Sequence, residues 1–270
     1  MPDWVLKEAH GLPLLMAEGL EGAVIAFSLR NGGMSEGCFG SLNLALHVGD
    51  TDEKVRANRE IFMHSLSLKP DDMVCCQQVH GNRVMRVGAK ERGRGALLYR
   101  DALPETDALI TDCEGLALCT FYADCIPLYF FDAATRCIGM AHAGWKGTMA
   151  GIARHTLDAM AKEFGACGDT LQCFIGPGIG PCCFEVGDDV ARRVQELYPQ
   201  HDVLLQQRGG RCFCDLKLAN KLMMKEWGIK EDNIRCSELC SCCEAELLYS
   251  YRRDKGVTGR MAALIMLTQT

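Results

Sequence analysis

The chain has 270 residues, enough for one large domain, and its hydrophobic and charged fractions of 48% and 24% are those of an ordinary globular protein. This composition excludes a disordered chain, and the longest apolar run, near residues 126–131, is far shorter than the roughly 20 residues of a transmembrane helix. A formal net charge of -6 argues against a nucleic-acid-binding protein and favours a small-molecule partner.

The first thirty residues contain acidic and basic side chains throughout and lack the basic start and apolar stretch of a signal peptide. We therefore expect a cytoplasmic protein that does not associate with a membrane. Seventeen cysteines are present, but their odd number and the expected reducing compartment indicate free thiols, most of them packed in the core.

The first half of the chain is predicted to be rich in strands, with one helix. A strand at residues 23–29 leads into a turn at 30–33, whose Asn and Gly residues tolerate positive φ. Asp50 and Glu53 have the spacing of a capping box before a helix that runs to about Leu66. Apolar runs bounded by Gly, Pro or Asp predict further strands at residues 73–78, 107–111, 116–122, 128–131 and 137–141.

The second half alternates helices and strands without a strict βαβ rhythm. Helical spacing predicts a helix at 148–164 that ends at Gly165, and another at 216–227 that ends at Gly228. The remaining predicted elements are a strand at 171–175, a helix at 188–197 and a strand at 261–267. We predict a single α/β domain spanning residues 1–270, with a mixed β-sheet and flanking helices.

Three segments place a metal-binding side chain at a predicted strand end beside Gly or Pro: His80, Cys125 and His142. Zinc takes imidazole nitrogen and thiolate sulfur in tetrahedral geometry, and three protein ligands leave the open position of a catalytic site. The separations are too long for a compact zinc finger, and an isolated His beside a glycine is more often an ordinary surface or core residue. The residues alone leave both interpretations open.

These segments belong to a longer series of motifs in a fixed order: SLRNGG at 28–33, SLNL at 41–44, Asn58-Arg59, QVHG at 78–81, ADCIP at 123–127, HAGWKG at 142–147, IGP at 175–177 and YRRD at 251–254. Together they resemble the laccase-domain or multicopper polyphenol oxidase family (YfiH type), whose members are also described as purine nucleoside phosphorylases. The resemblance runs from about residue 23 to 267. It implies an α/β domain with one zinc ion, or copper, bound to His80, Cys125 and His142.

The resemblance implies a purine nucleoside phosphorylase that acts on adenosine, inosine, guanosine and methylthioadenosine, and an adenosine deaminase activity. The expected partners are therefore purine nucleosides and phosphate. The family also carries an older description, copper-dependent oxidation of phenols. Multicopper oxidation needs many histidines close together, and only two of the seven here lie in the metal motifs. We rank purine chemistry first, a laccase-like polyphenol oxidase second, and a non-enzymatic, metal-stabilised binding protein third.

Five residues are assigned to the reaction. Cys125, Asp124 and Arg59 are the predicted catalytic residues; Asp124 is a candidate proton shuttle, or else a structural carboxylate that orients its loop. Arg59 is the first candidate for phosphate, because a guanidinium grips phosphate oxygens in a fork. Asn43, Arg59 and Lys146 are the predicted substrate-binding residues, although Asn43 and Lys146 suit turn-forming and solvent-facing roles equally well.

Other patterns compete with this interpretation. Cys236, Cys240 and Cys243 have a spacing that binds a four-iron cluster in radical enzymes, but such motifs normally open a large barrel. A glycine-rich segment at 176–181 resembles a dinucleotide loop but lacks the helix start and the third glycine, so a rigid turn is favoured. For the arginines at 252, 253 and 260, surface ion pairing is the favoured role for at least one.

Overall fold

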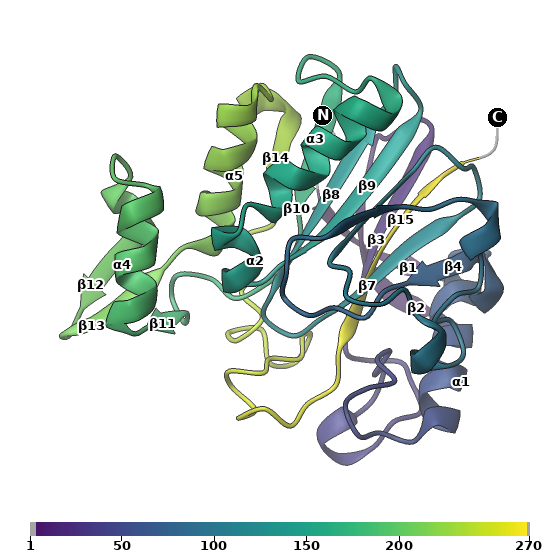
Figure 1. Ribbon diagram of the computed structural model, residues 1–270. Helices are drawn as coiled ribbons and strands as arrows, with labels where there is room; N and C mark the ends of the chain where they lie inside the picture. The colour runs from purple at the N-terminus through teal and green to yellow at the C-terminus, as the bar shows by residue number, and fades with distance from the viewer. Residues whose placement is uncertain (1–3, 269–270) are drawn as a thin grey trace.

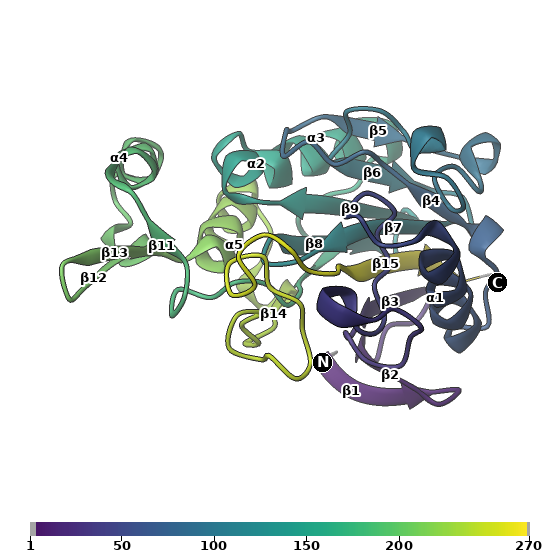
Figure 2. The same ribbon diagram turned by 90° about the horizontal axis from the view of Figure 1, so that it is seen from below.

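The computed structural model describes residues 4–268 and contains two six-stranded β-sheets packed face to face, with helices outside both sheets (Figure 1 and Figure 2). Each sheet combines parallel and antiparallel strand pairs. The predicted α/β class with a mixed β-sheet and flanking helices is therefore confirmed, and the long strands form two such sheets where one was predicted. In the part of the chain that the structure describes, no helix is long and apolar enough to cross a bilayer.

The first sheet has the strand order β1-β2-β3-β15-β7-β4. Its strands are β1 (Trp4–Ala9), β2 (Leu12–Ala17), β3 (Ala23–Ser28), β15 (Met261–Leu267), β7 (Ala117–Tyr122) and β4 (Met73–Cys75). The hairpin of β1 and β2 was not predicted, because β1 is an edge strand with no fully buried residue and so lacks a clear apolar pattern. The helix α1 (Asp52–Ser65) packs on the outer face of this sheet.

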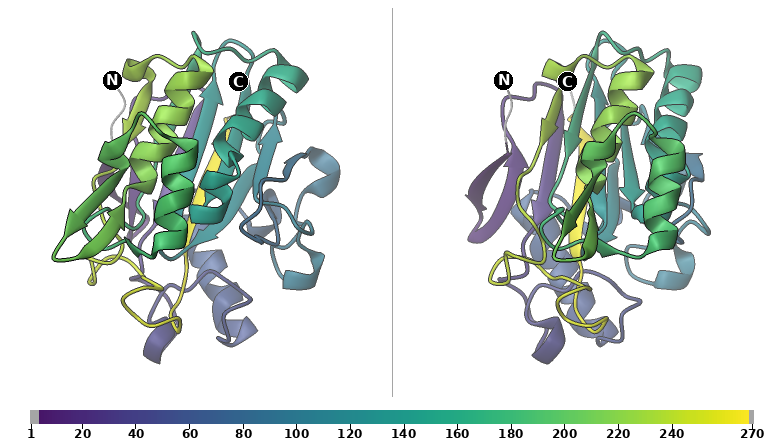
Figure 3. Two further views of the ribbon diagram at one scale, coloured as in Figure 1. Left: turned by 60° about the vertical axis from the view of Figure 1, so that its left-hand side comes forward. Right: turned by 90° about the vertical axis from the view of Figure 1, so that its left-hand side faces the viewer.

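The second sheet has the order β14-β10-β8-β9-β6-β5. Its strands are β14 (Ile234–Cys236), β10 (Leu171–Ile175), β8 (Ile126–Asp132), β9 (Cys137–Ala143), β6 (Ala108–Thr111) and β5 (Val84–Arg86). Two helices, α3 (Ile152–Phe164) and α5 (Leu216–Trp227), lie side by side over its outer face (Figure 3). The molecule is thus built from four layers.

Burial on both sides of each sheet explains the continuous apolar runs in the sequence. In β8, Leu128 and Phe130 face the helices, whereas Tyr129 and Phe131 face the first sheet. Successive side chains of a strand point to opposite faces, so a strand buried on both sides has no polar positions. Each fully buried side chain of this kind stabilises the fold by roughly 1.5–3 kcal/mol.

Two helix predictions are wrong in detail. The capping box predicted from Asp50 and Glu53 does not form. The helix α1 begins at Asp52 after Thr51, and the carboxylate of Asp50 instead accepts hydrogen bonds from the Ser35 hydroxyl and the Asn43 amide. The predicted helix at 148–164 is two helices, α2 (Trp145–Met149) and α3, because Gly151 adopts a left-handed conformation with φ 75° between them. The ends at Gly165 and Gly228 are confirmed.

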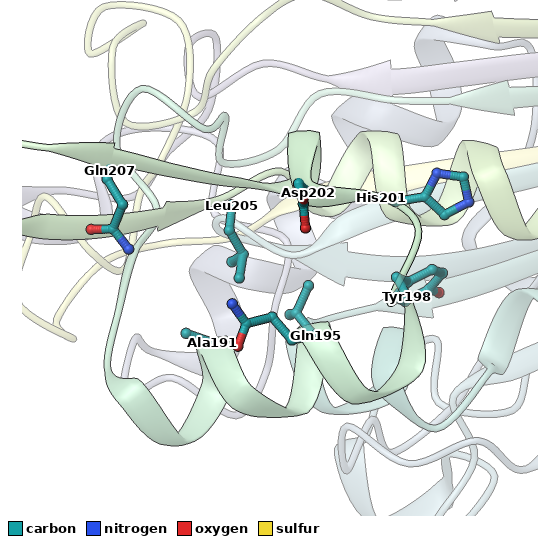
Figure 4. A pocket seen from close by; sticks show the side chains of 8 residues that line it. Ala191, Gln195, Tyr198, His201, Asp202, Leu205 and Gln207 are labelled. Atoms are coloured by element: carbon teal, nitrogen blue, oxygen red, sulfur yellow. The ribbon is translucent and has the colours of Figure 1, made fainter.

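A small unit projects from the two sheets (Figure 2). It consists of β11 (Glu185–Val186), α4 (Asp188–Leu197), β12 (Leu205–Arg208) and β13 (Arg211–Cys214). A cavity of about 200 Å³ lies between α4 and β12 and is lined by residues that include Tyr198 and His201 (Figure 4). Among the described residues, no cluster of metal-binding side chains lines this cavity.

Candidate metal centre

The three predicted metal ligands come from segments that meet where several strands begin or end, at one end of the two sheets. His80 follows β4, Cys125 lies where the chain crosses from β7 to β8, and His142 lies in β9 opposite Pro127. Their ligand atoms all lie within 4.8 Å of one another. His80 is exposed, Cys125 is half-buried and His142 is buried. The fold therefore assembles a two-histidine, one-cysteine set with access from solvent.

Asp107, which directly precedes β6 and is fully buried, holds two of these residues in place. Its Oδ1 atom accepts hydrogen bonds from His142 Nδ1 at 2.8 Å and from the His80 backbone N–H at 3.0 Å. Its Oδ2 atom accepts from the backbone N–H groups of Val79 and Gly81 at 3.2 and 2.8 Å. With Nδ1 of His142 engaged in this way, Nε2 is the nitrogen that remains for a metal. In the sequence, Asp107 is marked only as the first residue of the strand predicted at 107–111.

The neighbouring charges shift the pKa values of these groups. Burial opposes ionisation of the Cys125 thiol, but His142 and His80 outweigh it and lower its pKa to about 6. Burial likewise disfavours the charged form of His142, but Cys125 and Asp107 raise its pKa to about 9. At pH 7 the metal-free site is therefore a thiolate paired with an imidazolium, and the thiolate is the form of cysteine that binds metals.

Gly144 is required by the close approach of two ligands. A Cβ atom at this position would lie 2.9 Å from both Cys125 Sγ and His80 Cδ2. No larger residue fits without displacing a ligand, which explains the glycine that follows His142 and Ala143 in the sequence.

A cavity of about 600 Å³ opens beside the three ligands, within the size range of small-molecule sites. Its wall includes four aromatic side chains: Phe121, Trp145, Phe184 and Tyr251. It also includes three basic ones, Lys146, Arg252 and Arg260. Although the chain as a whole is acidic, these three basic side chains in one cavity favour an anionic ligand.

Besides the three metal ligands, two further predicted site residues, Asp124 and Lys146, line this cavity. Asp124 has φ 91°, and its two carboxylate oxygens accept hydrogen bonds from Ser241 Oγ and from the Arg252 backbone N–H, both at 2.6 Å. Both oxygens thus hold the loop between β14 and β15 in place, which agrees with the structural alternative for Asp124. Lys146 is exposed, with its Nζ atom 5.7 Å from the centroid of the Trp145 ring.

Arg59 does not line the cavity. It is only 2% exposed, and its guanidinium donates hydrogen bonds to the backbone carbonyls of Leu44, Gly95 and Ala96 at 2.6–2.8 Å. It lies 4.5 Å from the centroid of the Phe121 ring and therefore supports the wall from behind. Because the guanidinium is buried and donates to three carbonyls, it does not reach the cavity, and the predicted binding of phosphate by Arg59 does not agree with this geometry.

Asn43 is also buried away from the cavity. Its Oδ1 atom accepts a hydrogen bond from the Arg260 backbone N–H at 2.9 Å, and its amide donates to Asp50 at 3.0 Å. Asn43 thus positions Arg260 rather than facing a ligand itself. The Arg260 side chain bonds the carbonyls of Thr258 and Gly259 through Nη1, and among residues 4–268 no partner is found for its Nη2.

Arg260 and His47 also line the cavity, and neither was among the predicted site residues. Arg260 was one of three arginines for which the sequence suggested surface ion pairing. The protein around the His47 imidazole desolvates it and, with the charges of Arg260 and Arg59, lowers its pKa to about 4. His47 is therefore neutral at pH 7. No local pattern marks either residue, since both reach the cavity only through the tertiary fold.

Comparison with known proteins gives consistent matches along almost the whole chain. A family model described as multi-copper polyphenol oxidoreductase laccase matches residues 24–268. The purine nucleoside phosphorylase YlmD of Geobacillus stearothermophilus is 39% identical over 267 residues, which cover 98% of this chain and 97% of the relative. A crystal structure of YlmD from that species has a TM-score of 0.94 at 38% identity and covers 99% of this chain and 100% of the other. Adenosine deaminase RL5, from an unknown prokaryotic organism, is 32% identical over 240 residues, which cover 88% of this chain and 91% of the relative.

Proposed function

Because the chain belongs to the multi-copper polyphenol oxidoreductase laccase family, we propose that it is a metal-dependent enzyme that cleaves purine nucleosides with phosphate. The names of its relatives, purine nucleoside phosphorylase and adenosine deaminase, support this substrate class. The observation that carries the proposal is one cavity that combines His80, Cys125 and His142 with Arg252 and Arg260.

The donor set fits a single zinc ion. Two imidazoles and a thiolate are ligands that zinc prefers, and three protein ligands leave one coordination position open. Among the described residues the cluster contains no fourth Cys, His, Asp or Glu, which favours a catalytic over a structural ion. A bound zinc ion supplies a Lewis acid and lowers the pKa of a coordinated water. Copper suits the same nitrogen and sulfur donors and is the alternative occupant.

The remaining side chains of the cavity bind and orient the substrates. The rings of Phe121, Trp145 and Tyr251 offer flat apolar surfaces for the purine base. The guanidinium of Arg260, assisted by Arg252 and Lys146, binds phosphate and holds an oxygen toward the ribose C1′ carbon. Bond formation at C1′ breaks the bond to the purine nitrogen, and the base leaves with the electron pair.

Deamination of adenosine is a second activity of the same cavity, with water in place of phosphate, and the name of the relative RL5 supports it. Polyphenol oxidation ranks behind both. Among the described residues three histidines line the cavity, His47, His80 and His142, and a multicopper cluster needs more at close quarters.

The test is incubation of metal-quantified protein with adenosine, with and without phosphate, followed by chromatography with mass detection. We expect phosphate-dependent formation of adenine and ribose 1-phosphate, and inosine if deamination also occurs. Cys125→Ala should abolish the products. Cys167→Ala, which removes an exposed cysteine from the loop between α3 and β10, is the matched control and should retain activity.

Three outcomes would contradict the proposal. Formation of no purine product by the zinc- or copper-loaded protein would reject it, and oxidation of a phenol by the copper-loaded protein alone would replace it with the oxidase. Equal activity of Cys125→Ala and the unmodified protein would show that this cavity is not the site of the reaction.

A further inference from the structure

A second group of thiols lies outside the cavity. The Sγ atoms of Cys182, Cys183, Cys240 and Cys243 all lie within 4.8 Å of one another. Cys243 Sγ is 3.6 Å from Cys182 Sγ and 3.5 Å from Cys183 Sγ. Four sulfurs that surround one zinc ion at about 2.3 Å are roughly 3.8 Å apart, whereas a disulfide holds its sulfurs at about 2.05 Å. The observed spacing is that of ligands around a single ion.

We propose that these four thiolates bind a structural zinc ion, separate from the metal of the cavity. Four sulfur donors in a tetrahedral arrangement indicate zinc or iron, and a site closed by four protein ligands leaves no position for a substrate. The site is distinct from the proposed function, because none of its ligands lines the cavity of about 600 Å³.

The backbone builds this site from two tight turns. The Cys183 N–H donates to the Gly180 carbonyl at 3.0 Å, and the Cys243 N–H donates to the Cys240 carbonyl at 3.1 Å. The turns are joined because the Ser241 N–H donates to the Gly178 carbonyl at 3.1 Å. Each turn thus contributes two cysteines to one point, although about sixty residues separate them in the sequence.

Two further features suit a site that carries negative charge. The backbone N–H of Gly180 donates to Cys240 Sγ at 3.2 Å, the kind of contact that stabilises a thiolate. Lys217 is buried, its ammonium donates to the carbonyls of Ser237 and Leu239 at 2.7 and 2.8 Å, and it lines one hollow with Cys182 and Cys240. Four thiolates and one zinc ion have a net charge of -2, which this buried ammonium partly offsets.

The structure also separates this site from the iron–sulfur interpretation of Cys236, Cys240 and Cys243. Cys236 is not part of the group of four thiols, and its Sγ atom instead contacts the Ser237 carbonyl at 3.6 Å. Thiolates so close together enclose one ion and leave no room for a cluster of several iron and sulfide ions. The sequence pattern therefore shares Cys240 and Cys243 with the proposed zinc site, whereas Cys236 lies outside it.

The proposed ion connects the projecting unit to the loop that forms part of the cavity wall. Cys182 and Cys183 lie a few residues before β11, and Cys240 and Cys243 precede the segment with Arg252. The Arg252 guanidinium donates to the Glu185 carbonyl at 3.0 Å, across the same junction. Zinc at this point stabilises the arrangement of the two segments without taking part in chemistry.

The test is the metal content of protein purified under reducing conditions with zinc, measured by plasma mass spectrometry after desalting. The Cys125→Ala variant, which lacks the cavity site, should retain about one zinc equivalent. Adding Cys182→Ser and Cys183→Ser should remove it, whereas adding Cys236→Ser, the matched control, should not. Cobalt substituted into the Cys125→Ala variant should give the intense sulfur charge-transfer absorption of a four-thiolate site.

The proposal is overturned if Cys125→Ala holds no zinc, if Cys236→Ser removes the same equivalent, or if intact mass shows disulfides among the four cysteines. If the serine variants do not fold, alkylation of the unmodified protein decides the matter. Zinc should protect these four thiols, and a chelator should expose them; equal labelling with and without the chelator would reject the site.

Discussion

Asp107 shows how much of the candidate site depends on single residues outside the ligand set. Its two oxygens accept four hydrogen bonds, one from the His142 ring and three from the backbone of residues 79–81. The carboxylate thereby sets the tautomer of one ligand and the left-handed conformation of His80, with φ 62°. The family resemblance pointed to the three ligands in the sequence, but their orientation depends on this carboxylate.

We expect Asp107→Asn to weaken zinc binding by about 10–100-fold, because the amide nitrogen cannot accept the hydrogen bonds that one carboxylate oxygen now accepts. Competition with a chromophoric chelator measures the affinity. The control is Asp112→Asn, which alters an exposed carboxylate paired with Arg86 at 3.2 Å and should leave zinc affinity unchanged. Equal affinity of the Asp107→Asn variant and the unmodified protein would remove Asp107 from the site.

Zinc affinity should also depend on pH. With pKa values of about 6 for Cys125 and about 9 for His142, the metal-free pair carries one proton between these pH values, and zinc must displace it. The apparent affinity should therefore rise about tenfold per pH unit from 6 to 9 and level off above 9. Calorimetry near pH 7.5 in buffers of different ionisation enthalpy should detect the release of about one proton. An affinity that does not change over this range would show that the pair is not coupled as described.

At the scale of elements, α1 illustrates how a helix face can be read correctly and its function wrongly. Helical spacing placed Arg59 on the same side as Val55 and Phe62, and that side is the buried one. The guanidinium donates hydrogen bonds to the buried carbonyls of Leu44, Gly95 and Ala96, and so connects α1 to two loops. Its contribution is to the stability of the cavity wall.

We expect Arg59→Met to lower the free energy of unfolding by about 3–5 kcal/mol, because it leaves buried carbonyls without donors. Urea denaturation measures the change. Arg56→Met on the same helix removes a surface pair with Asp52 at 3.1 Å and should cost less than about 1 kcal/mol. If the Arg59→Met variant were as stable as the unmodified protein but its reaction rate no longer saturated with phosphate concentration, the predicted role of Arg59 in phosphate binding would be restored.

At the scale of the whole molecule, the cavity forms where the strand ends of two sheets meet the start of α2 and the loop between β14 and β15. The basic side chains that line it are distant in sequence, with Lys146 in α2 and Arg260 just before β15. These basic side chains share one cavity although the chain as a whole has a net charge of -6, and a cleft lined by one sign of charge raises the local concentration of ions of the opposite sign. This distribution of charge, rather than the net charge, accounts for the expected affinity for phosphate.

On the proposed function, Arg260→Gln should raise the KM for phosphate by about tenfold or more, because a charge-assisted hydrogen bond contributes about 1.5–3 kcal/mol. Zinc content should be unchanged, since Arg260 is not a ligand. Arg100→Gln, at a side chain that is 82% exposed, provides the control and should leave the KM for phosphate unaltered. A normal KM in the Arg260→Gln variant would place phosphate elsewhere in the cavity.

The sequence by itself determined the fold class, most of the buried elements and the family, although the buried strand β2 was missed. The strands β10 and β15 and the helices α4 and α5 have the predicted bounds, because each has an apolar pattern that its own burial requires. The edge strands β1, β5 and β12 were missed because they bury little and so have no such pattern. The order of the motifs identified the family, and the family match confirms it.

Only the tertiary structure decided which polar residues act together. It linked Asp107 to His142, Asn43 to Arg260, and the cysteines at 182 and 183 to those at 240 and 243. Local patterns report whether a residue is buried, since burial follows the period of a helix or strand. A site instead forms where distant segments converge, and hydrogen-bond and metal-ligand geometry are satisfied only in three dimensions.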